Sequence, residues 1–442
     1  MKRFTALLIV LALVLTTLLA GCSAPVSSDA SILSQPEETK GESMPWGNPM
    51  DAPPEGSMFA PNENIGQMPM KPEFSMDGNN TETTLETLPD TKAEDLFSDR
   101  DLDCSPDLSE AIAITAKDNS DYTIQSAGIY ALTGQASNFT VIVEANKEEK
   151  VQIVLNGAVI TNDNFPVIYV KSADKCFVTA TGSNTLSVNN LFVSDGDTNT
   201  DAVIFSKDDL TLNGTGSLTI LSAAGNGITS KDDMKITGGS YSITSALDAI
   251  EANDSISIYD GEFTITTNKD AFHCENDDPS GPIYIRDGSF TITAKDDGIQ
   301  ATTTLVVDGG EFNITAAEGM EATYVQINGG VININASDDG INAAGKSNEY
   351  DVVLEINGGE ITVVMGPGDT DCLDANGTII VNGGTINLTG NSTFDADRGS
   401  VYNGGTVIIN GTQVDSIPTS MTGGHGGFGG NKGNWPQGGN GD

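Results

Sequence analysis

The chain has 442 residues, of which 62 are acidic and 20 are basic, so its formal net charge at pH 7 is −42. Such a chain repels nucleic-acid phosphates, which excludes a nucleic-acid partner, and it suits cations, neutral polymers or acidic polymers bridged by cations. With 50 glycines and only 6% aromatic residues, its composition favours turns and short strands over helices.

The N-terminus carries a short targeting segment. Lys2 and Arg3 precede an apolar run over residues 6–20, which is too short for a membrane span. The run ends in Leu19-Ala20-Gly21-Cys22, which resembles the cleavage signature of bacterial lipoproteins. The resemblance implies that residues 1–21 are a signal peptide and that Cys22 is lipidated; an ordinary secretory signal or an uncleaved helix is the alternative. We therefore expect an extracytoplasmic protein at the cell surface that contacts the membrane through a lipid anchor only.

Two segments have no sustained periodicity. Residues 22–100 are rich in Pro, Ser, Met, Asn and Glu, which is typical of a disordered linker. Residues 419–442 are rich in Gly-Gly pairs and predict a flexible tail.

The region between them, residues 101–418, repeats itself. Units of the type Asp-Gly-Ile-x-Ala mostly recur every 21 or 22 residues, and steps of 25, 27 and 32 leave room for loops. About ten residues later each unit has a Gly-containing turn followed by alternating apolar residues, as in Val307-Asp-Gly-Gly-Glu-Phe-Asn-Ile. The units begin at Asp201, Asn226, Asp248, Asp270, Asp297, Glu318, Asp339, Asp371 and Ser392.

A unit of this length holds about three short strands and cannot bury its own apolar face, but stacked copies can. The sequence therefore predicts an all-β fold, a right-handed parallel β-helix with 21–22-residue rungs, the hand following from the crossover preference of parallel strands. Equivalent residues should form inward ladders about 4.8 Å apart. The large ladder is Val203, Ile228, Ile250, Phe272, Ile299, Met320, Ile341, Leu373 and Phe394; the small one is Ser230, Ala252, Cys274, Ala301, Ala322, Ala343, Ala375 and Ala396.

Four cysteines follow Cys22. The repeat places Cys274 and Cys372 four rungs apart, which is beyond bridging distance, so we expect them in or near the core. A disulfide between Cys104 and Cys176 stays open.

The repeats and the motifs before them resemble a family of bacterial carbohydrate-binding lipoproteins, β-helices similar to calcium-dependent pectate lyases. The resemblance covers roughly residues 110–410. It implies a right-handed β-helix, bound calcium, and binding of cellulose or polygalacturonate, without implying catalysis. It rests on Gly128-Ile-Tyr-Ala-Leu-Thr-Gly, Val151-Gln-Ile-Val-Leu-Asn-Gly, Ile168-Tyr-Val-Lys-Ser-Ala-Asp-Lys, Ser206-Lys-Asp-Asp-Leu-Thr-Leu-Asn-Gly and the Asp-Gly-Ile repeats.

The acidic residues of the repeat independently suggest a cation. Carboxylates one rung apart repel by about 3 kcal/mol per pair at an effective dielectric near 20, and calcium prefers six to eight oxygen ligands. The alternative is that Asp before Gly only forms turns. No Cys or His spacing fits zinc. The candidate calcium ligands are Asp248, Asp270, Asp296, Asp297, Glu318, Glu321, Asp338, Asp339, Asp371 and Asp374.

Three functions compete. The favoured one is a monomeric, calcium-binding module for a plant cell-wall or other polysaccharide. The second is a calcium-dependent lyase acting by β-elimination, with Lys269 or Lys295 as the base; the alternative for both lysines is a surface ion pair. The third is a passive adhesin without glycan affinity.

Aromatic residues offer few platforms for sugar rings. The alternation of the strands predicts that Tyr241, Phe263, Phe290 and Phe312 pack in the core. Three tyrosines are expected at the surface: Tyr259, Tyr324 and Tyr402.

Overall fold

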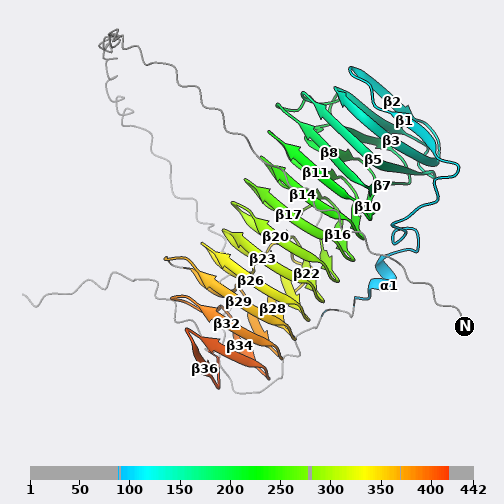
Figure 1. Cartoon of the computed structure of the whole chain (residues 1–442). Coiled ribbons are helices and arrows are strands. Elements are labelled where there is room, and N and C mark those ends of the chain that lie inside the picture. The colour runs from blue at the N-terminus through cyan, green and yellow to red at the C-terminus, as the bar shows by residue number, and fades with distance from the viewer. Residues whose placement is uncertain (1–87, 89–90, 277–280, 369, 418–442) are drawn as a thin grey trace, which may run out of the picture. The chain divides into compact units, whose positions relative to one another are not determined.

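The computed structural model describes residues 88, 91–276, 281–368 and 370–417 (Figure 1). The chain divides into a unit of residues 1–80 and a unit of residues 81–442, and every described residue belongs to the second. The predicted signal peptide, Cys22, residues 22–87 of the predicted linker and the predicted tail lie outside the described residues. Within the described part, no helix is long and apolar enough to cross a membrane.

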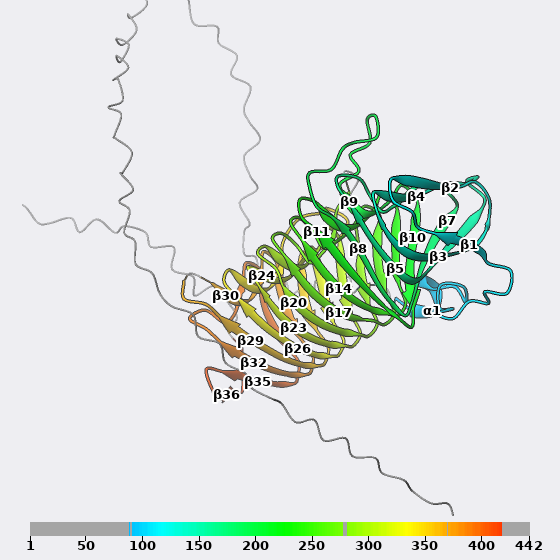
Figure 2. The same ribbon diagram turned by 45° about the horizontal axis from the view of Figure 1, so that its top comes forward.

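Each turn of the chain contributes a strand to each of three walls, and the turns stack into a parallel β-helix (Figure 1). The predicted all-β solenoid is therefore confirmed. The first wall is a sheet of 12 parallel strands, some of which come into view in Figure 2. They are β2 (Ser120–Ile124), β4 (Phe139–Glu144), β6 (Ile168–Ser172), β9 (Ala202–Ser206), β12 (Asn226–Ser230), β15 (Ile250–Ala252), β18 (Phe272–Cys274), β21 (Asp297–Ala301), β24 (Glu318–Ala322), β27 (Asp339–Ala343), β30 (Asp371–Ala375) and β33 (Asp395–Ala396).

The other 24 strands form one sheet that bends around the remaining two sides. The second wall consists of β1 (Ile112–Thr115), β7 (Lys175–Thr181), β10 (Asp209–Gly214), β13 (Asp233–Ile236), β16 (Ser255–Ile258), β19 (Ile283–Ile285), β22 (Thr304–Val307), β25 (Tyr324–Ile327), β28 (Val353–Ile356), β31 (Thr378–Val381) and β34 (Gly399–Tyr402). The third wall consists of β8 (Ser183–Val188), β11 (Ser217–Ser222), β14 (Ser240–Ser245), β17 (Glu262–Thr267), β20 (Ser289–Thr293), β23 (Glu311–Ala316), β26 (Val331–Ala336), β29 (Glu360–Met365), β32 (Thr385–Thr389) and β35 (Thr406–Ile409).

Three further strands join the walls or close the stack. The long strands β3 (Gly128–Ser137) and β5 (Lys150–Asn162) run through both the second and the third wall. At the far end, β36 (Thr412–Val414) pairs antiparallel with β35.

The inward ladders of the first wall confirm the predicted register over most rungs. Ile250 pairs with Ile228 and with Phe272, and Ala252 pairs with Cys274. The prediction is wrong by one residue at β9, where the partner of Ile228 is Ile204 and not Val203. Before β9 the spacing departs from the repeat, so the alignment of a single copy could not fix its register.

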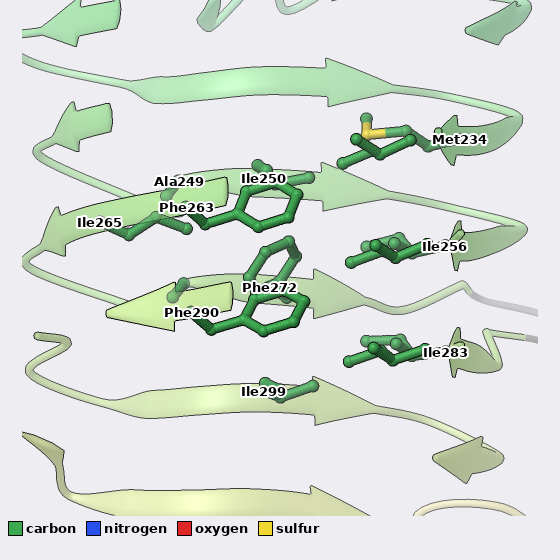
Figure 3. Packing of buried hydrophobic residues seen from close by; sticks show 14 of the residues in the cluster. Met234, Ala249, Ile250, Ile256, Phe263, Ile265, Phe272, Ile283, Phe290 and Ile299 are labelled. Atoms are coloured by element: carbon green, nitrogen blue, oxygen red, sulfur yellow. The ribbon is translucent and has the colours of Figure 1, made fainter. Parts of the chain in front are cut away.

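Aromatic rings form a column inside the third wall. Ring centroids of Tyr241 and Phe263 are 5.3 Å apart, those of Phe263 and Phe290 are 4.9 Å apart, and those of Phe290 and Phe312 are 4.4 Å apart. Figure 3 shows Phe263 and Phe290 stacked beside Phe272, with Met234, Ile256 and Ile283 lining the second wall. The predicted packing role of these aromatic residues is confirmed, because all of them are buried.

The turns between the second and third walls explain the Asn-Gly-Gly signature. Gly330 and Gly359 have φ values of 94° and 92°, which L side chains rarely adopt. A Cβ on Gly359 would also lie 3.0 Å from the carbonyl oxygen of Gly330 on the preceding rung. In the same turns a ladder of side-chain amides joins Asn328, Asn357, Asn382 and Asn403, with N···O distances of 2.7 to 2.8 Å.

Residues 88 and 91–104, which we call the N-terminal strap, lie against the outer face of the second wall. They include the helix α1 (Ala93–Leu96). Phe97 is buried against Tyr284 and Val306. Asp101 is 1% exposed and accepts a hydrogen bond of 2.9 Å from Thr211. Part of the predicted linker, including Leu88 and Phe97, therefore packs on the β-helix.

The strap also corrects one aromatic prediction. Tyr324, expected at the surface, is buried beside Leu88 of the strap, and its hydroxyl donates a hydrogen bond of 2.8 Å to Glu355. Tyr259 and Tyr402 are half-buried.

The four described cysteines are free. Cys176 is buried in the core, where burial raises the pKa of its thiol to about 12. Cys104 lies on the strap, with its Sγ 3.7 Å from the carbonyl oxygen of Thr237. The disulfide considered between Cys104 and Cys176 is therefore absent. Cys274 and Cys372 are core residues, as predicted.

Candidate functional site

The acidic residues of the repeat stack along the first wall, and we call this stack the carboxylate ladder. The first acid of a unit accepts a hydrogen bond from the backbone N–H of the equivalent residue on the next rung. The N···O distances are 3.1 Å from Asp270 N to Asp248, 2.9 Å from Asp297 N to Asp270, and 3.1 Å from Asp371 N to Asp339. These carboxylates thus link successive rungs, a role beyond that of a local turn residue, and each bond engages only one of the two carboxylate oxygens.

The stretch of the ladder at β15 and β18 has cationic partners in the protein. Lys269 Nζ lies 2.8 Å from Asp248 Oδ2, and His273 Nδ1 lies 3.3 Å from the same oxygen. Burial alone would raise the pKa of Asp248, but the hydrogen bonds and charges of His273 and Lys269 outweigh it and lower that pKa. Asp270 is less well compensated, and burial raises its pKa to about 6.

The same contacts act on the two cations. Burial would lower the pKa of His273 and of Lys269, yet in each case the hydrogen bond to Asp248 and the charges of Asp248 and Asp270 together outweigh burial and raise the pKa. His273 Nε2 is also 3.1 Å from Glu275. Lys269 is therefore held in its protonated form as the partner of Asp248, which makes it a poor general base.

The next stretch, at β21 and β24, is crowded with carboxylates. Oxygens of Asp297, Glu318 and Glu321 lie within 4.8 Å of one another. Burial, followed by the charge of Glu318, raises the pKa of Asp297 to about 9. Burial, followed by the charge of Glu321, raises the pKa of Glu318 to about 7. In the described part of the chain, the cation that pairs with this group is Lys346, whose Nζ is 2.6 Å from Glu321.

The last rungs of the ladder repeat the crowding of carboxylates. Oxygens of Asp371, Asp374 and Asp395 lie within 4.8 Å of one another. Burial, followed by the charge of Asp339, raises the pKa of Asp374 to about 7, and burial raises that of Asp339 to about 6.

One buried amide next to the crowded group has an unsatisfied oxygen. Asn342 is 8% exposed, and its Nδ2 donates hydrogen bonds of 3.1 Å to Glu318 and 3.4 Å to Glu321. Its Oδ1 is buried and accepts no hydrogen bond. A half-turn of this amide would present the oxygen to the same two carboxylates. The donors present here, several carboxylates and one amide oxygen, are those that calcium prefers, so the residues fit that ion.

The structure brings together most of the predicted acids. Asp248 and Asp270 meet His273; Asp270 meets Asp296 and Asp297; Asp297 meets Glu318 and Glu321; and Asp371 and Asp374 meet Asp395. Asp338 and Asp339 join no such group of three within the described residues; Asp338 is exposed, and Asp339 pairs in register with Asp371.

Sequence reasoning gave no site role to three participants. His273 occupies the fourth position of its unit, where most other units have Glu, Asp, Gln, Asn or Thr. The acidic residues at this position in other units were the available signal. Lys346 comes from an insertion and Asn342 is uncharged, so neither stood out. A further acidic group, Asp209 with Asp232 and Asp233, lies on the second wall away from the ladder.

The second lysine considered as a base differs from the first. Lys295 is exposed and forms no ion pair among the described residues. It lines a groove of about 410 Å³ with Thr315, Asn335 and Val364.

Comparison with known proteins identifies the fold's family. A family described as carbohydrate-binding domain-containing protein matches residues 118–372, which is more than half of the chain. The chain belongs to this family. The match runs from the first rungs to β30, so it contains most of the carboxylate ladder, and membership supports a polysaccharide as the partner of the β-helix.

Two individual proteins are similar to parts of the chain. A carbohydrate-binding domain-containing protein of Acetivibrio thermocellus is 34% identical over 124 residues, which cover 27% of this chain and 43% of that relative. The chain thus spans less than half the length of this relative. A solved structure described as a polysaccharide lyase-like protein from C. thermocellum, a gadolinium derivative, is 22% identical and covers 64% of this chain and 98% of that chain, with a TM-score of 0.35.

Proposed function

We propose that the protein is a cell-surface lipoprotein that binds polysaccharide and holds calcium on its carboxylate ladder. The family match over residues 118–372 is the observation that carries the polysaccharide part. The calcium and the lipid anchor at Cys22 rest on arguments from this chain's own residues.

The case for calcium comes from the electrostatic repulsion among the crowded carboxylates at β21 and β24. Asp297 and Glu318 have pKa values of about 9 and about 7, so at neutral pH the group retains protons that ordinary carboxyls lose. A divalent cation would replace those protons and accept electron pairs from several oxygens at once. The unsatisfied Oδ1 of Asn342 offers another oxygen beside Glu318 and Glu321.

Calcium on this wall would serve binding in one of two ways. It would stiffen successive rungs by joining their carboxylates, or it would bridge the ladder to the carboxylates of a uronate polymer. Without a cation, the net charge of −42 opposes an acidic polymer.

The test is a pull-down of the purified chain on polygalacturonate and on cellulose, with calcium and with chelator. We expect polysaccharide binding by the parent, and calcium-dependent binding on polygalacturonate. The variant Asp297→Asn/Glu318→Gln should lose the calcium dependence, whereas Asp121→Asn, an exposed acid of β2, should not. Binding that is equal in calcium and in chelator would refute the role of calcium, and no binding to either polymer would favour the adhesin.

The same samples test the lyase. Unsaturated uronate products absorb ultraviolet light, so absorbance that grows with time and disappears in Lys295→Ala would replace the binding module by an enzyme. Lys269→Ala is the weaker candidate, because Lys269 is already paired with Asp248.

The anchor has its own test. In a bacterial host, the parent should fractionate with membranes and Cys22→Ser should be released. Equal membrane association of the two would refute lipidation at Cys22.

A further inference from the structure

The outer face of the third wall carries three outward columns of residues. Two of them are uncharged and, except for Val364, polar, whereas the third, at the start of the strands, includes the exposed Glu262, Glu311 and Glu360. Strands β14, β17, β20, β23, β26, β29 and β32 alternate buried and outward residues in register. One uncharged column is Ser242, Thr264, Thr291, Asn313, Asn333, Thr362 and Asn387; the other is Thr244, Thr266, Thr293, Thr315, Asn335, Val364 and Thr389.

These columns stand out because they contain no charged side chain. On an ordinary protein surface about a quarter to a third of the residues are charged, and this chain has a net charge of −42. Over seven successive strands, neither column includes an Asp, Glu, Lys or Arg. The third wall therefore has a strip of two uncharged columns, bordered on one side by Glu262, Glu311 and Glu360, whereas the neighbouring first wall concentrates carboxylates.

Strand propensity explains only part of this composition. Threonine is a good strand former, but asparagine is depleted in strands, and four asparagines occur in the columns. Amide ladders that stabilise the stack are the other structural explanation, and the turns between the second and third walls contain one, with distances of 2.7 to 2.8 Å. In the columns, by contrast, the described residues form a single side-chain hydrogen bond between members, 3.3 Å from Asn333 to Asn313. Most of these hydroxyls and amides are thus available to a ligand.

The chemistry of the columns suits the hydroxyl groups of a sugar. Threonine hydroxyls and asparagine amides each donate and accept hydrogen bonds, as sugar hydroxyls do, whereas ionised Lys or Glu offers one role only. Threonine is also stiff at χ1, so it loses little conformational freedom when a ligand binds. Rungs about 4.8 Å apart repeat on the scale of a hexose ring.

A groove continues the strip toward the first wall. It has a volume of about 410 Å³ and is lined by Thr315, Asn335 and Val364 of the second column, together with the exposed Lys295 at its edge. Its floor is made by small residues on successive rungs, Ala294, Ala316 and Ala336. A sugar chain lying on the columns would therefore find space along one edge as well as a flat surface.

We propose that these two uncharged columns of the third wall, with the bordering groove, are the docking surface for a neutral β-linked glucan lying along the axis of the β-helix. The inference rests on the proposed polysaccharide binding and assigns it to a wall that does not contain the carboxylate ladder. Because the strip is uncharged, the neutral glucan binds here without calcium, whereas an acidic polymer binds to the first wall through calcium.

The test compares two charge insertions in the full chain on microcrystalline cellulose, in chelator. Thr264→Glu/Thr362→Glu adds charge to the first column, and Thr115→Glu/Thr123→Glu adds the same charge to exposed strand positions of the other two walls. We expect the association constant of the column variant to fall about ten-fold or more, and that of the control to stay within about two-fold of the parent. Unfolding midpoints and calcium-dependent binding to polygalacturonate should be unchanged in both variants.

Four results would overturn the inference. The first is that the column variant binds cellulose as strongly as the parent. The second is that the parent binds polygalacturonate with calcium but does not bind cellulose; this result would leave the proposed function intact. A parent that sediments as a dimer while the column variant is a monomer would make the face a contact between copies. A parent that binds neither polymer would remove the proposed function as well.

Discussion

Two stretches of the carboxylate ladder share a repeat and differ in what neutralises it. At β15 and β18, Lys269 and His273 lie within 3.3 Å of Asp248, and the pKa of that carboxyl is lowered. At β21 and β24, Asp297 and Glu318 face other acids, and their pKa values rise to about 9 and about 7. The same position of the repeat is thus an ion pair on the rung of Asp248 and a crowded acid two rungs later, at Asp297.

The difference teaches that the acidic repeat does not define a site by itself. The units supply a backbone link from rung to rung everywhere, as the contacts of Asp248, Asp270 and Asp339 illustrate. What a unit can bind depends on the residues beside the repeat, because a lysine or histidine there occupies the place that a cation would take. We therefore expect calcium at β21 and β24 before β15 and β18.

The largest expected difference between the two stretches is in how they make the free energy of unfolding depend on pH. Asp297 and Glu318 have folded pKa values above those of the unfolded chain, so their contribution is complete below about pH 4 and is lost as the pH rises through about 7 to about 9. In chelator we expect the free energy of unfolding to fall by about 4 kcal/mol or more between about pH 5 and about pH 8, since one excess proton is worth about 1.4 kcal/mol per pH unit.

Urea unfolding at several pH values measures this change, and calcium should reduce it. Asp248 contributes with the opposite sign, because its lowered pKa makes its stabilisation disappear as the pH falls below about 4. A free energy of unfolding that rises with pH in chelator would contradict the raised pKa values.

Removing a cation should make the first stretch resemble the second. Lys269→Met leaves Asp248, which is 5% exposed, without its lysine, and we expect a loss of about 2 kcal/mol at neutral pH. The loss should shrink when calcium is added, because the ion can take the place of the lysine. Lys150→Met is the matched control, since Lys150 and Asp174 are 46% and 44% exposed and such a pair contributes about 0 to 1 kcal/mol. Equal losses in the two variants would show that Asp248 does not depend on Lys269.

Removing an acid should make the second stretch resemble the first, with the smallest effect on stability. Asp297→Asn eliminates the most crowded carboxylate, and we expect a gain of about 1 kcal/mol at pH 8 in chelator, together with weaker calcium binding measured by titration calorimetry. Asp121→Asn, at an exposed position of β2, should change neither quantity. A variant less stable than the parent in chelator would indicate that the carboxylate of Asp297 is needed as a hydrogen-bond acceptor.

The fold could be predicted from the sequence because each unit repeats the same physical demand. Ile228, Ile250 and Phe272 recur at one spacing, and that spacing sets both the pairing and the inward direction. The register failed at Val203, where an irregular connection interrupts the repeat and nothing in one copy distinguishes it from its neighbour Ile204.

The candidate site was predictable only in outline, since a repeat reveals what its copies share. The acids were found by position, whereas the contacts of His273, Asn342 and Lys346 depend on residues that occur once. The burial of Tyr324 was missed for the same reason, because Leu88 covers it from a segment with no periodicity.

The N-terminal strap affects how the β-helix unfolds. In a solenoid each rung touches only its neighbours, so rungs can be lost one at a time from an end. The strap contacts Thr211 on β10 through Asp101, Tyr284 on β19 through Phe97, and Tyr324 on β25 through Leu88. Because this one short segment contacts distant rungs, detaching it from one rung weakens its contacts with the others. The middle of the β-helix should therefore unfold as a single cooperative unit, while its C-terminal rungs fray.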